Sequence, residues 1–289
     1  MKKTDLPALY FTADLTSNEA QKSLLFYNKW STFLLIAAVI ASIEGTKISW
    51  LPLISAICFF GSLSTYVYSK YQKFQELWYQ SRALAESIKT ASWRLVMSAE
   101  PFNARDEEQN LEAFRKILTE LLLENKGLGK NLSNFEPQHE EITDRMLEIL
   151  HSSFDEKKEI YLKERIENQR LWYSNESGEN RKNSMKYLWF IVGVYIAAII
   201  FLLVRIANPE ASFLPVDILA IVASGLIGWT DIKRYDELAS AYGLTAHEIG
   251  IIKSRYQSVM SSQHLASFVK DAENAFSREH TQWAARRDK

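Results

Sequence analysis

The longest apolar stretch of the chain lies at residues 187–204, which contain no charged side chain. As an α-helix, this stretch is long enough to cross the hydrocarbon core of a bilayer. A polar break begins at Arg205, and a second apolar run occupies residues 213–229. Two apolar helices joined by a polar turn form a hydrophobic hairpin, so the pattern predicts a hairpin over residues 187–229. A buried helical hairpin inside a soluble domain is the alternative, and the pattern favours the membrane.

The same pattern occurs once before, over residues 30–68. Residues 30–43 are apolar, a turn occupies residues 44–47, and residues 48–68 are again free of charge. The first run is short for a membrane span, but the apolar positions before it extend it if Lys29 snorkels to the surface. The chain is therefore predicted to carry two hairpins and four membrane spans.

Outside the hairpins, apolar residues recur at helical spacing. Between the first hairpin and Pro101 they form one helical face: Leu77, Leu84, Ile88, Ala91 and Leu95. The last helix carries a face of the same kind: Phe268, Val269, Ala272, Phe276 and Trp283. With only 10 glycines and 6 prolines in 289 residues, few positions interrupt a helix. The fold class that we expect is an all-α membrane protein, with two transmembrane helical hairpins and a cytoplasmic helical bundle.

Two capping boxes predict where helices begin. Thr16 and Glu19 place the start of the first helix near Thr16, after an extended segment over residues 5–11. This helix would run on into the first hairpin. Thr245 and Glu248 place the start of another helix near Thr245, after the second hairpin.

The chain is predicted to divide into two units of the same plan. Residues 127–138 contain two glycines, two asparagines and a proline, so the boundary is placed among them. The N-terminal unit would cover residues 1–130 and the C-terminal unit residues 131–289, each with one hairpin and its cytoplasmic helices. The segments that follow the hairpins, residues 70–77 and 233–238, are also similar, which indicates a weak internal repeat.

The distribution of lysine and arginine predicts the orientation of the hairpins. Basic residues lie before and after each hairpin, whereas each turn holds a single one, Lys47 or Arg205. The turns at residues 44–47 and 205–212 are therefore predicted to lie outside, and both termini and the polar helices in the cytoplasm. The first residues also lack the continuous apolar core of a cleavable signal peptide. We expect a multi-pass protein of the plasma membrane.

Composition and charge argue against several classes of function. A net charge of −1 and a pI of 6.6 give no reason to expect a nucleic-acid partner. Cys58 is the only cysteine, so neither a disulfide within the chain nor a thiolate metal cluster can form. The histidines are scattered rather than set at metalloprotease spacing, and no serine occupies a nucleophile elbow. We therefore predict no catalytic residue, no metal site, no cofactor and no enzyme activity.

Two charged residues lie inside or beside the second hairpin, Arg205 and Asp217. An ionisable side chain in a membrane span is costly, and it usually faces a pore, a partner charge or the interface. Four spans are few for a channel made by one chain, so a conducting path would require a homo-oligomer. The alternatives are that Arg205 snorkels from a helix end, that Asp217 lies at the interface, or that the two residues pair across the turn.

A second group of candidates lies in the predicted cytoplasmic helices. It combines aromatic and polar side chains from before the second hairpin with others near the C-terminus: Trp172, Tyr173, Asn180, Glu273, Glu279, His280 and Trp283. These residue types suit a cytoplasmic ligand site. Helix packing is the alternative explanation for all of them.

Each half of the chain also resembles the SLATT domain of prokaryotic conflict systems. The residues that carry the resemblance in the C-terminal half are Tyr161, Arg165, Gln169, Trp172, Tyr173 and Asn180 before the hairpin, and Phe268, Val269, Glu273, residues 277–280 and Trp283 after it. The N-terminal half is similar to another SLATT subtype through residues 6–10, Trp93, Arg94 and residues 99–102. The resemblance covers nearly the whole chain, as tandem copies.

The resemblance implies a function. SLATT proteins have two transmembrane helices per domain and are proposed to be pore-forming effectors, often encoded beside nucleotide-signal synthases or nucleotide-sensing domains. For this chain it implies an antiphage effector of the bacterial inner membrane. Its expected partners are the lipid bilayer, further copies of itself, and a nucleotide second messenger or a sensor protein. A non-conducting membrane anchor or scaffold, whose cytoplasmic helices bind a partner protein, is the alternative.

Overall fold

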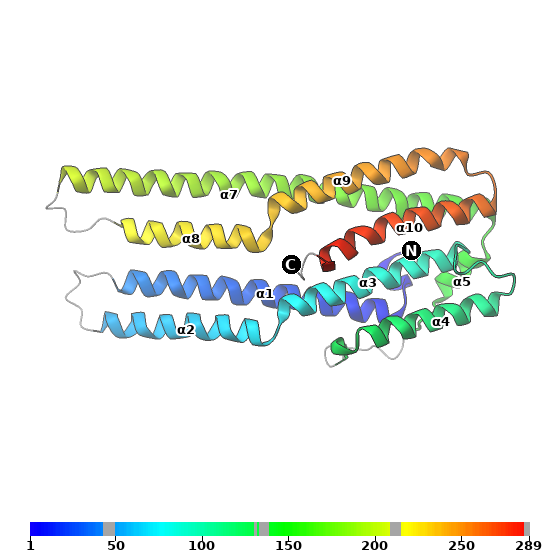
Figure 1. Ribbon diagram of the computed structural model, residues 1–289, viewed down its shortest axis with the longest axis horizontal. Helices are drawn as coiled ribbons and strands as arrows, with labels where there is room; N and C mark the ends of the chain where they lie inside the picture. The colour runs from blue at the N-terminus through cyan, green and yellow to red at the C-terminus, as the bar shows by residue number, and fades with distance from the viewer. Residues whose placement is uncertain (43–49, 130–131, 133–138, 209–214, 286–289) are drawn as a thin grey trace. The chain divides into compact units, whose positions relative to one another are not determined.

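The computed structural model describes five stretches of the chain, residues 1–42, 50–129, 132, 139–208 and 215–285. In the last stretch, side chains are described as far as Phe276. Within these stretches every regular element is a helix (Figure 1). The all-α class is therefore confirmed for the part of the chain that is described. The predicted turn at residues 44–47 and the second half of the predicted turn at residues 205–212, residues 209–212, lie outside the described residues.

The helices group into two compact units, and each unit draws on both halves of the chain. We call the first the bundle unit, which comprises Met1–Gln21, Gln75–Ser174 and Gly243–Lys289. We call the second the hairpin unit, which comprises Lys22–Phe74 and Asn175–Tyr242. The predicted division at residues 1–130 and 131–289 concerns repeats along the chain, and it stays a prediction.

The first hairpin of the hairpin unit is formed by α1 (Ala8–Ala41) and α2 (Leu51–Tyr71), which run in opposite directions (Figure 1). A serine recurs on the buried face of α2 at every seventh position: Ser55, Ser62 and Ser69. The Ser55 hydroxyl donates to the Ala38 carbonyl at 2.8 Å, and the Ser62 hydroxyl donates to the Ser31 carbonyl at 2.9 Å. Small side chains let two membrane helices approach closely, and such hydrogen bonds hold them together.

The second hairpin is formed by α7 (Asn168–Ala207) and α8 (Val216–Lys233). Gly225 of α8 packs against α1, because a β-carbon at this position would lie 2.9 Å from the Thr32 methyl group. The two hairpins therefore contact each other within this unit.

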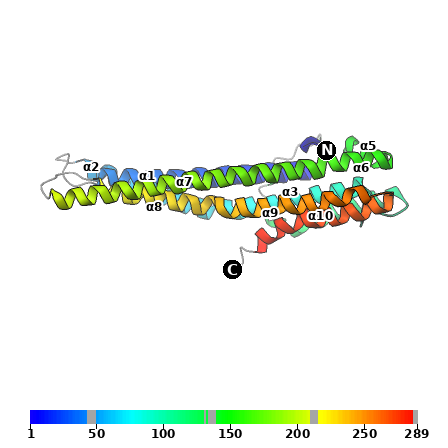
Figure 2. The ribbon, with the colours of Figure 1, turned by 90° about the horizontal axis from the view of Figure 1, so that it is seen from above.

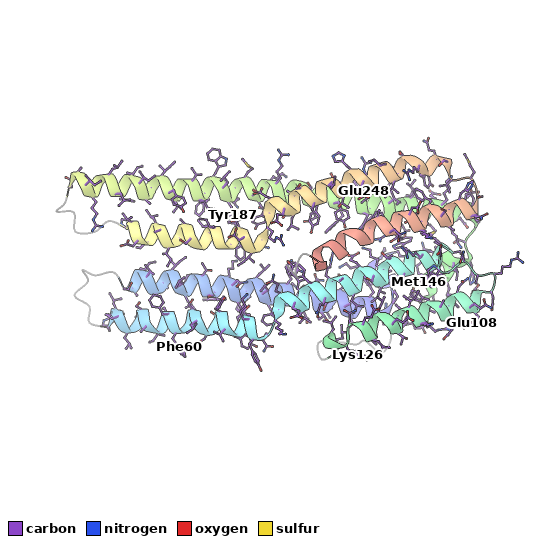
Figure 3. The ribbon with its side chains drawn as sticks, in the orientation of Figure 1. Phe60, Glu108, Lys126, Met146, Tyr187 and Glu248 are labelled. Carbon is purple, nitrogen blue, oxygen red and sulfur yellow. The ribbon has the colours of Figure 1, made fainter. Side chains whose placement is uncertain are left out.

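Three stretches are long and apolar enough to cross a membrane: Ala8–Ala41, Leu51–Val96 and Phe154–Ala207. Most of their apolar surface is exposed. Phe60 on α2, which Figure 3 labels, is an example, because this residue is 73% exposed. The shorter α8 is apolar as well, but its 18 residues include the charges of Asp217, Asp231 and Lys233. The structure thus supports a membrane protein with three long candidate spans.

The segments that follow the two hairpins are built in the same way. Lys73, between α2 and α3 (Phe74–Val96), has a φ of 51°, and Arg234, between α8 and α9 (Tyr235–Ser254), also has a φ of 51°. At each junction an aromatic ring of the hairpin stacks on the first residue of the next helix: Tyr27 on Phe74 at 5.5 Å and Tyr187 on Tyr235 at 5.4 Å. These matching junctions strengthen the internal repeat that residues 70–77 and 233–238 indicate.

The bundle unit contains α3, α4 (Glu107–Glu124), α5 (Asp144–His151), α6 (Phe154–Ile160) and α10 (Ser262–Ala285), together with the beginning of α1 and the second half of α9. The predicted apolar face of α3 is confirmed for its last four members, which are all buried: Leu84, Ile88, Ala91 and Leu95. Trp93, Phe114 and Met146 are buried as well, and Figure 3 labels Met146. A π-helix, η3 (Tyr161–Glu167), joins α6 to α7, and Figure 2 shows α6 continuing directly toward α7.

Both helix starts predicted from capping boxes are wrong. Helix α1 begins at Ala8, eight residues before Thr16, whose hydroxyl donates to the Thr12 carbonyl inside the helix at 2.8 Å. A distant segment caps α1 instead: the Glu140 carbonyl accepts from the Ala8 N–H, and the Glu141 carboxylate accepts from the Leu9 N–H at 3.1 Å. These acceptors satisfy backbone donors that a local cap would otherwise have to satisfy.

The second of these errors concerns α9. Thr245 lies in the middle of that helix and is buried, although the capping box places a helix start there. The helix begins ten residues earlier, at Tyr235, directly after the left-handed residue Arg234. The turn at Arg234 therefore decides where α9 starts, and the Thr245–Glu248 pattern does not.

Candidate functional site

The most polar part of the bundle-unit core is centred on Glu273 of α10, which is 0% exposed. The Arg165 guanidinium donates two hydrogen bonds to this carboxylate, from Nε to Oε1 at 2.8 Å and from Nη2 to Oε2 at 2.6 Å. The Tyr161 hydroxyl donates to Oε1 at 2.9 Å, and the Thr90 hydroxyl donates to Oε2 at 3.1 Å. Each carboxylate oxygen thus accepts two hydrogen bonds, which is what a buried carboxylate requires.

Two helical elements supply the partners of Glu273. Tyr161 and Arg165 both come from the π-helix η3, and Thr90 comes from α3 in the other half of the chain. π-Helical turns are rare and often mark functional positions. The Trp93 ring packs edge-on against Tyr161 with a centroid distance of 5.6 Å, and the Phe276 ring lies 4.7 Å from the Arg165 guanidinium. Aromatic rings therefore enclose the ion pair and shield it from water.

Burial and charge act in opposite directions on Arg165. Burial alone would lower the pKa of its guanidinium, but the charge and hydrogen bonds of Glu273 outweigh that effect and raise the pKa. For Tyr161, burial and then the charge of Glu273 both raise the pKa of the hydroxyl. Arg165 stays charged and Tyr161 stays neutral, so the cluster holds one buried cation and one buried anion.

A second carboxylate, Glu86, lies near this ion pair on α3. Lys89 Nζ lies 3.5 Å from one of its oxygens, and Arg82 lies 3.3 Å from the other. Burial lowers the pKa of Lys89, and the negative charge of Glu86 opposes that shift. The Glu86 charge also contributes to raising the pKa of Arg165. The polar core of the bundle unit is thus an extended cluster of alternating charges.

Four of the predicted cytoplasmic candidates lie in the described part of the chain. Tyr173 is buried completely, and the partly exposed Trp172 packs edge-on against it at 4.9 Å. The buried Asn180 donates to the Glu176 carbonyl one turn earlier in the same helix. Glu273 is the centre of the buried ion pair described above. The proposed role of these four residues in a ligand site stays a prediction, and helix packing stays its alternative.

The other three candidates of this group are Glu279, His280 and Trp283. The backbone at these positions belongs to α10, but their side chains lie outside the described residues. Their role as ligand-binding residues stays a prediction.

The core residues that the sequence analysis missed are those of the first half of the chain. Glu86 and Thr90 lie one turn apart on the side of α3 opposite to Leu84 and Ile88, and both are buried. Arg82 and Lys89 stand four residues before and three residues after Glu86, and this spacing is the local signal for a charged cluster on that side of α3. No pattern along the chain shows that Thr90 bonds to a residue 183 positions away.

The two charged candidates of the second hairpin are both exposed. Arg205 is in the last turn of α7, and Asp217 is in the first turn of α8. Neither side chain makes a hydrogen bond or an ion pair with a residue that the structure describes. Within the described chain, the two therefore do not pair with each other. Among the described residues, no group of three or more His, Cys, Asp or Glu side chains lies close enough together to hold a metal ion.

Comparison with known families gives two matches that follow one another along the chain. Residues 7–158 match the family SLATT_3, described as SMODS and SLOG-associating 2TM effector domain 3. Residues 161–283 match SLATT_1, described as SMODS and SLOG-associating 2TM effector domain 1. The predicted resemblance to tandem SLATT domains is confirmed. No curated protein and no solved structure matches the chain.

Proposed function

The chain belongs to the family of SMODS and SLOG-associating 2TM effector domains and carries two of them in tandem; from this premise we propose that it is an oligomeric, pore-forming membrane effector of bacterial antiphage defence. In this proposal, α8 is the fourth span beside the three long apolar stretches. The chain has no enzyme activity and acts on the membrane itself. A nucleotide second messenger or a sensor protein triggers it through the bundle unit.

The observation that carries the proposal is the exposure of α7. Its most apolar stretch has no buried residue, and four aliphatic side chains there are each more than half exposed: Ile196, Ile199, Ile200 and Leu203. Such a surface requires lipid or further copies of the chain around it. An oligomer in the bilayer supplies both.

The charges of the second hairpin support a conducting path. Arg205 and Asp217 are exposed and make no ion pair within the described chain. Ionisable groups at membrane depth generally face water or a partner charge. An oligomer with the second hairpin at its axis forms rings of these charges, and such rings set ion preference by repelling ions of like sign.

An ion-flux assay tests the proposal. The full chain is reconstituted into liposomes, and efflux is recorded with and without candidate cyclic nucleotides. We expect efflux that depends on the trigger. In planar bilayers, Asp217→Asn should shift the reversal potential toward the equilibrium potential of the anion, because it removes a ring of negative charge. Arg205→Gln should shift the reversal potential toward the equilibrium potential of the cation, because it removes a ring of positive charge.

The first hairpin provides the matched control. Ser64→Ala lies on an exposed part of α2 and should leave the reversal potential unchanged. Unchanged reversal potentials in both charge variants would contradict the axial placement of the second hairpin. A wild type that never conducts under any trigger would favour the non-conducting anchor or scaffold.

A further inference from the structure

The contact between the two hairpins brings two lysines together. Gly225 of α8 lies against Thr32 and Ile36 of α1, and the two helices run in opposite directions (Figure 1). Residues before Thr32 on α1 therefore lie beside residues after Gly225 on α8. Lys29 is one helical turn before Thr32, and Lys233 is two turns after Gly225, which places both ammonium groups at the same end of this contact.

Both lysines lie beside the contact of α8 with α1, and no ion pair of the described residues includes either of them. The positive charge of Lys29 acts on Lys233, so the two groups are near enough to repel. Neither forms an ion pair with a residue in the described part of the chain. The nearest acid along α8, Asp231, is two residues from Lys233, and side chains at that spacing do not face each other on a helix. A bound anion would relieve the repulsion.

The surroundings of the lysines are those of a membrane interface. Lys233 Nζ lies over the Trp229 ring, 5.6 Å from its centroid. Phe33 and Ile40 follow Lys29 on its face of α1, four and eleven residues later, and they are 59% and 50% exposed. Tryptophan and lysine concentrate where lipid headgroups meet the hydrocarbon core, and basic pockets between membrane helices bind lipid phosphates.

We propose that Lys29 and Lys233, with Trp229 beside them, bind the headgroup phosphate of an anionic phospholipid whose acyl chains lie along Phe33 and Ile40. A lipid explains both halves of the site, because a soluble phosphate would neutralise the lysines and leave the adjoining apolar surface uncovered. The inference rests on the membrane placement of the hairpins and does not depend on conduction. Lipid binding and ion flux can therefore fail independently.

The test compares lipids by their effect on thermal unfolding of the full chain in a zwitterionic detergent. Phosphatidylglycerol should raise the unfolding midpoint of the wild type at concentrations where phosphatidylcholine does not. Lys29→Gln and Lys233→Gln should each raise the half-effective phosphatidylglycerol concentration about fivefold, which corresponds to one lysine near an anionic surface. The double arginine variant, Lys29→Arg with Lys233→Arg, should keep the wild-type response because it keeps both charges.

Lys70 provides the matched control. Lys70 Nζ lies over the Tyr66 ring, 5.8 Å from its centroid, much as Lys233 lies over Trp229. Unlike Lys233, on which the charge of Lys29 acts, Lys70 has no second lysine acting on it among the interactions of the described residues. Lys70→Gln should respond to phosphatidylglycerol like the wild type. An equal response to both lipids, an undiminished response in the double glutamine variant, or full replacement of the lipid by inorganic phosphate would each overturn the proposal.

Discussion

At the scale of single residues, the buried ion pair between Arg165 and Glu273 is the feature on which the bundle unit depends most. Both side chains are withdrawn from water, and each is the direct ion-pair partner of the other. A buried pair of this kind adds little stability compared with an apolar pair of the same shape. Removing one partner costs much more stability, because the other partner is then left buried, charged and unpaired.

Glu273→Gln should therefore destabilise the bundle unit strongly. The amide has the shape of the carboxylate but leaves the Arg165 charge without a counter-charge, for which about 3–5 kcal/mol of unfolding free energy is typical. Chemical denaturation followed by circular dichroism measures the loss. Glu100→Gln, which removes a surface partner of Lys270, should change the stability little. A Glu273→Gln protein as stable as wild type would mean that water reaches Arg165.

The raised pKa of the Tyr161 hydroxyl predicts how the stability of the protein changes at alkaline pH. Burial and the charge of Glu273 raise the pKa of its hydroxyl well above the ordinary value of 10.0, so the folded state favours the neutral form. The contribution of Tyr161 is complete below pH 10.0 and is lost as the pH rises above that value, because the unfolded chain then releases the proton more readily. Unfolding curves at increasing pH measure this loss.

The control for this effect is Tyr161→Phe. It should be less stable than wild type at neutral pH, because it lacks the hydrogen bond to Glu273. Its stability should fall less steeply above pH 10.0, since one buried hydroxyl that resists ionisation is gone. Equal alkaline slopes in the two proteins would contradict the assignment to Tyr161.

At the scale of elements, the first hairpin is held together by small side chains. The serine stripe of α2 (Ser55, Ser62 and Ser69) keeps α2 close to α1, and two of its hydroxyls bond to carbonyls of that helix. The close contact requires that nothing larger than serine stands at these positions. The pattern of apolar runs along the chain cannot reveal this, because a single serine changes the mean hydropathy of a span too little to mark a helix contact.

Ser62→Leu should separate the two helices. A leucine on the buried face of α2 overpacks the contact, which typically costs about 1–3 kcal/mol, and the hydrogen bond to Ser31 is lost as well. Thermal unfolding in detergent measures the change. Ser64→Leu makes the same substitution two residues away at an exposed position and should be tolerated. Equal melting of the two variants would show that α2 does not rely on the stripe.

At the scale of the whole molecule, the orientation in the membrane is the largest open prediction. Cysteines introduced at Thr46 and Ser212 in a Cys58→Ser background should react with an impermeant thiol reagent added to intact spheroplasts, because lysine and arginine are concentrated at the opposite ends of the spans. Cysteines at Ser174 and Ser262 should react only after lysis. Labelling of the cysteines at Ser174 and Ser262 in intact spheroplasts would contradict the predicted topology and support the opposite one.

The sequence by itself determined the class of the molecule. Apolar length predicts the hairpins, and helical spacing predicts the buried faces of α3 and α10, as Ile88 and Val269 illustrate. These properties reside within one segment, since a helix satisfies its own backbone and exposes a periodic face whatever packs against it. The distributed SLATT signature was visible for the same reason: its residues keep their order and spacing along the chain.

Only the tertiary structure decided which distant segments meet. Glu141 caps a helix 132 residues before it, and Glu273 accepts a hydrogen bond from a residue 183 positions away, so neither role leaves a local pattern. The helix starts predicted from the local capping boxes at Thr16 and Thr245 were wrong, because distant contacts and a turn let both helices begin earlier in the chain. The cost of burying a polar group is settled by all of its neighbours in space, and the order of residues along one segment does not contain that information.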